Sequence, residues 1–183
     1  MTLLVIEIKV PSHELVASHG LASSLAALWP SYLAFLTSFV TILVIWVHHH
    51  MVFALIEKND HPFLYWNGLL LLCVTFVPFP TALLAEYLLH ADGKVAAKLY
   101  TATFLAISLA FAALWRHAST KLLAEDASRA QRREAQQITR QYRLGTPLYL
   151  CAFALSFVSE GWSIAACLLV AFFFALWRSP ATK

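Results

Sequence analysis

The sequence predicts an all-α membrane protein: a polytopic membrane helix bundle with six transmembrane helices, the first of which is incomplete. Apolar residues make up 60% of the 183-residue chain and charged residues 13%, and the mean hydropathy is +0.68. A soluble domain of this size has too much surface to hide so many apolar side chains. The spacing of the apolar stretches and the positions of the tryptophans define the individual helices.

Five apolar stretches follow one another along the chain. They run Leu28–Val47, Phe63–Leu89, Val95–Trp115, Leu144–Val158 and Trp162–Trp177. The first three are long enough to cross a hydrocarbon core, which takes roughly 20 helical residues. The last two are shorter and predict a tight helical hairpin, with a pair that only dips into the membrane as the alternative. All six tryptophans lie near the ends of stretches, where indole rings favour the membrane interface.

The N-terminal residues 1–10 form a short apolar segment that Pro11 ends. The segment is too short to span a membrane, and it lacks the basic region and cleavage site of a signal peptide. It resembles the second half of a transmembrane helix, which makes the expected helix count six. We therefore treat residues 1–183 as a single transmembrane domain.

The basic residues predict the orientation of the chain. Seven of the thirteen Lys and Arg lie in the linker 117–143 and at its border, at Arg116. Short basic loops stay in the cytoplasm, so the linker and the C-terminus are expected there, in a multi-pass protein of the cell membrane. Two interpretations of the linker remain open: contact with anionic lipid headgroups, or, preferred, a solvated segment that sets the topology. Nucleic-acid binding is not expected, because no reader module is present.

Catalytic and metal-binding groups are scarce. Charged residues are almost absent from the apolar stretches, and no catalytic motif is present, so an enzyme and a cofactor are not expected. The three cysteines, all in apolar runs, are interpreted as packing residues. Consecutive helical residues point about 100° apart, so the triplet His48-His49-His50 is not expected to form a metal site. One of these histidines is expected to face the bundle interior.

Two further features lie within the second apolar stretch. Asn67, just inside its helix, is expected to bridge helices through its amide. Pro78 and Pro80 remove two backbone donors in mid-membrane and predict a bend. The bend either shapes a pore or cavity or serves packing only.

Three segments resemble the prokaryotic members of the transmembrane protein 175 family of potassium channels. Residues 2–11 (TLLVIEIKVP) are similar to the end of the family's first helix, and residues 46–53 (WVHHHMVF) resemble its Trp-x-x-His signature. Residues 67–72 and 78–84 resemble its third helix. The likeness is specific across residues 2–84 and looser afterwards.

The resemblance implies a six-helix subunit that assembles as a homotetramer and conducts potassium through a pore lined by the first helix. In that family apolar side chains narrow the pore, and a threonine one turn further along favours potassium. The corresponding residue here is Thr2, and Ile6, one turn on, is expected to face the same pore. Apolar constrictions of this kind can gate by dewetting.

The family's Phe-Ser-Asp motif, early in its first helix, is absent from this sequence. By position, Trp46, His49 and Asn67 are the polar partners that the motif is expected to contact. We considered two explanations, a truncated relative or a start further upstream, and favour the second because residues 2–11 are intact family sequence.

The predicted function is therefore a potassium-selective ion channel subunit, with potassium ions, the lipid bilayer and further copies of itself as partners. Two alternatives from other classes are a small membrane transporter or lipid-handling protein, with its substrate near Pro78 and Pro80, and a non-conducting assembly subunit.

Overall fold

The computed structural model describes residue 8 and the ranges 10–56, 58–123 and 128–176. Within these ranges every regular element is a helix, which confirms the all-α fold class. The elements are α2 (His13–His19), α3 (Leu21–Ala27), α4 (Trp29–Ala54), α5 (His61–Phe76), α6 (Pro78–Tyr87), α7 (Gly93–His117), a π-helical turn η1 (Ala118–Leu122), α8 (Arg129–Leu155) and α9 (Glu160–Leu176).

Three helical segments of the described chain are long and apolar enough to cross a membrane. They are α4, the continuous pair α5 and α6, and α7 with η1, and α9 is a shorter apolar helix. These segments coincide with the predicted stretches to within a few residues, except that α4 continues past Val47 to Ala54, and α7 with η1 continues past Trp115 to Leu122. The chain is an integral membrane protein, as its composition predicted.

Most of the basic linker forms the first half of helix α8. This half carries the arginines of the linker, and the second half of the helix is the fourth apolar stretch. The helix starts at a capping box: the Gln131 N–H donates to Ser128 Oγ (3.2 Å), and the Ser128 N–H donates to Gln131 Oε1 (2.8 Å). The linker 117–143 is thus largely helical wherever the structure describes it.

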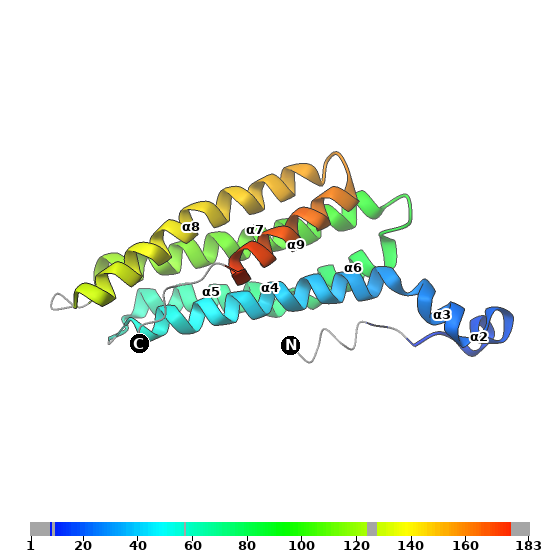
Figure 1. Ribbon diagram of the computed structural model, residues 1–183, viewed down its shortest axis with the longest axis horizontal. Coiled ribbons are helices and arrows are strands. Elements are labelled where there is room, and N and C mark those ends of the chain that lie inside the picture. Colours follow the sequence, from blue (N-terminus) through cyan, green and yellow to red (C-terminus); the bar gives the residue numbers. More distant parts are fainter. Residues whose placement is uncertain (1–7, 9, 57, 124–127, 177–183) are drawn as a thin grey trace.

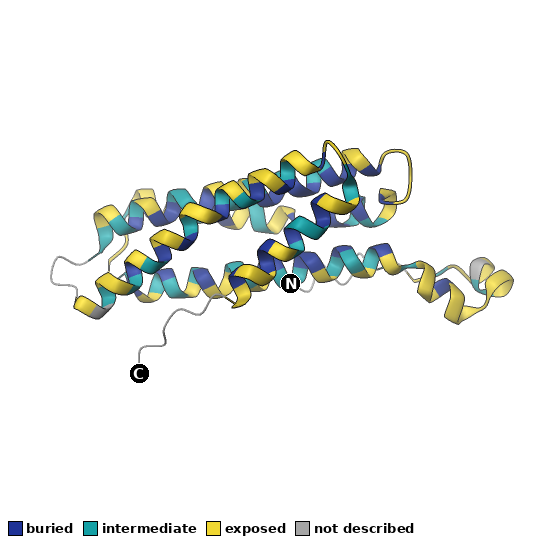
Figure 2. Ribbon diagram, turned by 45° about the horizontal axis from the view of Figure 1, so that its top comes forward, coloured by how far each residue is buried: buried dark blue, intermediate teal, exposed yellow. Residues whose placement is uncertain are grey.

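The central element of the bundle is α7. It packs against α5, α6, α8 and α9, while α4 packs against α6 and α9 (Figure 1). Small and aromatic residues at helical spacing are buried along α7, among them Ala97, Tyr100, Phe104 and Phe111. Figure 2 shows the buried faces turned towards the interior, and the outer faces exposed. Those outer faces are mostly apolar, as expected where the solvent is lipid.

The boundary between α5 and α6 follows from the two prolines. Pro78 has no N–H to offer the Val74 carbonyl, which accepts instead from the Val77 N–H at 3.2 Å. Pro80 likewise has no N–H for the Phe76 carbonyl. The ladder of helical hydrogen bonds is therefore interrupted at Val77, although its φ of −53° and ψ of −38° stay helical. The bend at these two prolines stays a prediction.

Two short helices that the sequence analysis did not predict precede the first span. Helices α2 and α3 are separated by Gly20, which has a positive φ of 78°. This backbone conformation favours glycine because it lacks a Cβ atom. The chain therefore turns at Gly20 before entering α4.

Candidate functional site

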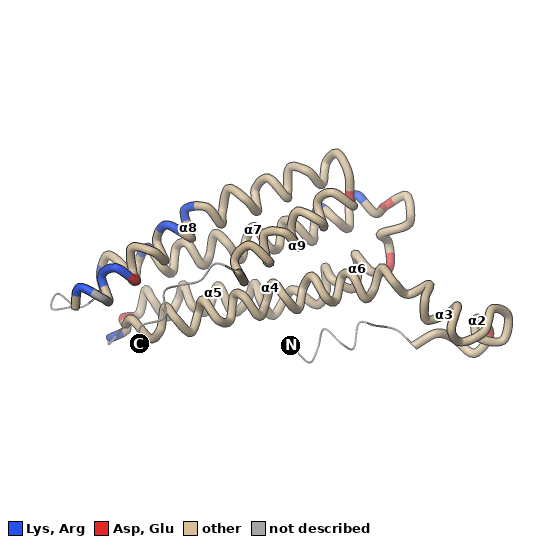
Figure 3. Tube along the Cα trace, viewed as in Figure 1, with Lys and Arg blue, Asp and Glu red and all other residues tan. Residues whose placement is uncertain are grey.

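Polar contacts between helices mark the candidate functional site, since each polar group inside lipid needs a partner. Two of them join α7 to α8, Ser108 with Thr146 at 3.1 Å and Trp115 with Thr139 at 2.9 Å. Three others join segments further apart: one in the middle part of α4, one near the C-terminal end of α4, and one at the end of the bundle where α8 begins. Figure 3 shows that most Lys and Arg residues gather at this last end.

A chain of hydroxyl groups joins three helices midway along the bundle. Ser38 Oγ of α4 lies 2.8 Å from Thr81 Oγ1 of α6 and 3.0 Å from the Tyr100 hydroxyl of α7. Thr81 donates its own hydrogen to the Val77 carbonyl at 2.8 Å. Ser38 must therefore donate to Thr81, and Tyr100 must donate to Ser38, because each hydroxyl has one hydrogen. The chain ties the interrupted turn at Val77 to α4 and α7.

The second contact lies near the end of α4. His49 Nε2 is 2.8 Å from Asn67 Oδ1 of α5, so the imidazole N–H donates to the amide oxygen. Trp46 does not join this pair. It is 60% exposed and stacks on His50, with ring centroids 6.0 Å apart. Of the three residues expected to be polar partners of the family's Phe-Ser-Asp motif, the structure brings together His49 and Asn67.

His48 faces the interior of the bundle. Its side chain is buried against the rings of Tyr142 and Phe174, each with a centroid distance of 6.0 Å. A cavity of about 60 Å³ adjoins it between α4, α7, α8 and α9. One histidine of the triplet is thus interior, as expected.

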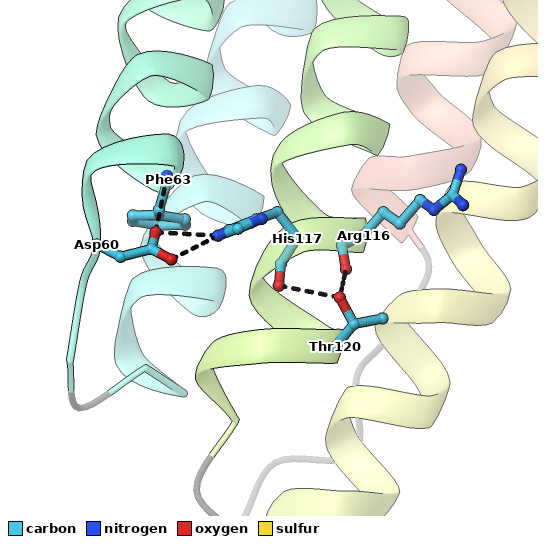
Figure 4. A network of polar contacts seen from close by, with 5 residues as sticks. All are labelled: Asp60, Phe63, Arg116, His117 and Thr120. Atoms are coloured by element: carbon cyan, nitrogen blue, oxygen red, sulfur yellow. Dashed lines mark hydrogen bonds and ion pairs between the residues drawn. The ribbon is translucent and has the colours of Figure 1, made fainter.

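The third contact joins the beginning of α5 to the end of α7 (Figure 4). Asp60 caps α5 by accepting the Phe63 N–H at 2.9 Å, and His117 Nε2 lies 2.9 Å from both carboxylate oxygens of Asp60. The Phe63 N–H is the largest cause that holds the pKa of the Asp60 carboxyl below its usual value; desolvation, the next largest, opposes it, and the hydrogen bond and charge of His117 lower the pKa further. The pair connects the chain between α4 and α5 to the central helix.

Of the other predicted site residues, the structure describes the two prolines but not the two pore residues. Thr2 and Ile6 lie outside the described residues. Pro78 and Pro80 lie at the start of α6, one turn or less before Thr81. Sequence reasoning missed Ser38, Tyr100 and the Asp60–His117 pair. The signal for Ser38 was a hydroxyl residue deep in an apolar stretch, but its partners are 43 and 62 residues away along the chain.

Asn67→Leu is expected to lower the free energy of unfolding by about 0.6 to 1.7 kcal/mol, because His49 loses its acceptor in an apolar setting. Chemical unfolding in detergent micelles measures this change. The control is the double variant His49→Leu/Asn67→Leu, which removes both partners and is expected to recover part of the loss. If the double variant loses as much stability as Asn67→Leu and His49→Leu lose together when each is made alone, the result would contradict the assigned bond.

Comparison with known proteins identifies the family. The family model described as the endosomal/lysosomal potassium channel TMEM175 matches residues 1–78. A potassium channel of Chamaesiphon minutus is 59% identical over 99% of this chain and 88% of its own length. The chain belongs to the TMEM175 family. A potassium channel of Streptomyces collinus is 38% identical over 98% of this chain and 86% of its own length.

The three-dimensional comparison agrees with the family membership. The crystal structure of a lysosomal potassium-selective channel TMEM175 homolog from Chamaesiphon minutus superposes with a TM-score of 0.89 at 58% identity, covering 98% of this chain and 90% of that one. The likeness found at residues 2–84 of the sequence is therefore confirmed and extends along the whole bundle. Membership also confirms the prediction that this is not an enzyme, since the family is one of channels.

Proposed function

We propose that the protein is a subunit of a potassium-selective channel, in which four copies form a central pore from their N-terminal segments. The observation that carries the proposal is the 59% identity, over 99% of the chain, to a protein named a potassium channel. In this proposal Thr2 favours potassium, and Ile6 lines the same pore beside an apolar constriction.

The bundle itself supports a role as the scaffold of the pore. Within the described ranges the buried polar residues are Ser, Thr, His and Gln, and no Asp, Glu, Lys or Arg is buried. The centre, around α7, is filled by side chains such as Tyr100, Phe104 and Leu114, each at most 1% exposed. A hydrated ion path is therefore easier to form between subunits than through this core. Closed cyclic symmetry is the usual way to enclose such a path.

Flux into proteoliposomes tests conduction. Vesicles with the purified protein are expected to take up potassium faster than sodium, and faster than empty vesicles. Flux should rise with potassium concentration without saturating in the range where carriers saturate. Saturable uptake would favour a transporter instead, and no uptake by folded protein would contradict conduction by this chain.

Thr2→Ala tests the proposed selectivity residue. The variant is expected to lose several-fold of the potassium-over-sodium preference while retaining flux, because the hydroxyl no longer offers a ligand to the dehydrated ion. The ratio of the two flux rates measures the effect. Thr75→Ala is the matched control, since the Thr75 hydroxyl is exposed and bonds the Leu72 carbonyl of its own helix. An unchanged ratio in Thr2→Ala would remove this residue from the pore.

Assembly and orientation complete the proposal. The mass of the complex in mild detergent should be that of four chains, and a stable monomer would contradict the tetramer. We expect the basic half of α8 and the C-terminus to lie in the cytoplasm, and the concentration of arginines at one end of the bundle supports this orientation. A fluorescent protein joined after Lys183 should then fluoresce, whereas one exported to the outside in unfolded form should stay dark.

A further inference from the structure

A groove lies between α5 and the end of α7, at the end of the bundle where the basic residues gather. Its volume is about 540 Å³. Its walls are apolar towards the middle of the bundle and polar towards the end. The lining residues that carry the inference are Trp66 from α5, Ala112, Ala113 and Arg116 from α7, and Thr120 and Lys121 from η1.

The apolar half of the groove suits an acyl chain. Ala112 and Ala113 are half-buried and small, so they leave room beside the Trp66 indole, which is 39% exposed. An indole near the end of a membrane-spanning helix marks the depth at which lipid headgroups meet hydrocarbon. The groove therefore crosses the boundary between the chains and the headgroups of the surrounding lipid.

Two cationic side chains line the polar half of the groove. Arg116 and Lys121 are both exposed, and both line the groove. Residues five apart on an α-helix point about 140° away from each other. Here the chain passes through η1, in which the Leu123 N–H donates to the Ala118 carbonyl five residues earlier at 3.1 Å. This wider turn rotates Lys121 back towards the side of Arg116.

Among the described residues, the Asp60 carboxylate contacts His117, which also lines the groove, and it is already engaged by that imidazole and by the Phe63 N–H. The carbonyl end of α7 disfavours an anion, and Thr120 uses its hydrogen on the Arg116 carbonyl at 2.7 Å. An anion in the groove thus depends on the Arg116 guanidinium and the Lys121 ammonium, which match a phosphate diester in charge.

We propose that this groove binds one anionic phospholipid per subunit, with its phosphate between Arg116 and Lys121 and an acyl chain along Trp66. This site is separate from the arginines of α8, whose side chains line no part of the groove. It is also independent of whether the protein conducts potassium, since binding is measured directly.

Native mass spectrometry of the purified protein in detergent tests the proposal, with phosphatidylglycerol as the probe. One phosphatidylglycerol per subunit is expected to bind more tightly than phosphatidylcholine with the same acyl chains. Soluble glycerol 3-phosphate tests for a free phosphate site, and it is expected not to bind at the same concentration. Equal binding of the two lipids, or binding of glycerol 3-phosphate as tight as that of the lipid, would overturn the proposal.

Paired variants locate the site. Arg116→Gln/Lys121→Gln is expected to weaken phosphatidylglycerol binding about thirtyfold, because the variant lacks two positive charges near the membrane surface. Arg129→Gln/Arg133→Gln removes the same charge from exposed positions on α8 and should change binding less than twofold. Both double variants should unfold at the temperature of the parent, because all four side chains are exposed. An equal loss in both pairs, or no loss in the first, would overturn the assignment.

Discussion

Tyr100→Ala is expected to lower the free energy of unfolding by about 3 to 5 kcal/mol, the range for deleting a large buried aromatic side chain. Tyr100 is fully buried in the central helix, and its ring packs edge-on against Phe104 at a centroid distance of 4.9 Å. The substitution leaves a cavity where α4, α6 and α7 meet. It also removes the hydroxyl that donates to Ser38.

Two companion variants separate packing from hydrogen bonding at this position. Tyr100→Phe keeps the ring and removes only the donor, so a loss of about 1 kcal/mol is expected, because Ser38 still donates to Thr81. Tyr65→Ala is the matched control: Tyr65 is 80% exposed on α5, and its loss should be within about 0.5 kcal/mol. Chemical unfolding in detergent micelles provides all three values. Equal stability of Tyr100→Ala and Tyr65→Ala would contradict the central place of Tyr100.

Gly93→Ala is expected to have the second-largest effect, a loss of about 1 to 3 kcal/mol from overpacking. Gly93 is the first residue of α7 and follows the tight turn from α6. A Cβ atom here would lie 2.7 Å from the Leu88 carbonyl oxygen and 3.0 Å from that of Tyr87. Both contacts are with backbone atoms, so a side-chain rotation cannot relieve them. The turn and the start of α7 must move instead.

Gly68→Ala is the matched control for Gly93→Ala. A Cβ atom at Gly68, in the interior of α5, meets nothing within 4 Å. The change should stabilise the protein by about 0.5 to 1 kcal/mol, because alanine loses less conformational freedom in a helix than glycine. The two variants add the same methyl group and are expected to move the unfolding midpoint in opposite directions. Loss of stability in both would mean that α5 has a neighbour at Gly68, such as a second subunit.

Much of the architecture could be predicted because lipid imposes a simple rule on sequence. A spanning segment must be apolar and helical over its whole length, so Trp29–Ala54 and Gly93–His117 stand out without knowledge of their neighbours. The interruption of helical hydrogen bonds before Pro78 also follows from a local cause, since proline lacks the N–H that its helix requires. The helix of the basic linker has a local cause as well, since its sequence is rich in Ala, Arg and Gln.

The partners of the polar side chains could not be predicted in this way. Asn67 was expected to bridge helices, but the choice of His49 over Trp46 depends on which side of α4 faces α5. Ser38 and Tyr100 are 62 residues apart, and only the packing of both α4 and α7 against α6 and α9 brings their hydroxyls within 3.0 Å.

Local chemistry thus determined where this chain is helical, where it crosses the membrane and where its helical hydrogen bonds are interrupted, because backbone hydrogen bonds and burial in lipid act over a few residues. The family likeness of residues 2–84 added the expected role. The tertiary structure decided which polar groups meet, the place of α7 at the centre, and the approach of Arg116 and Lys121 to one groove. These depend on the rotation of each helix about its own axis, which is set by packing between segments far apart in the sequence.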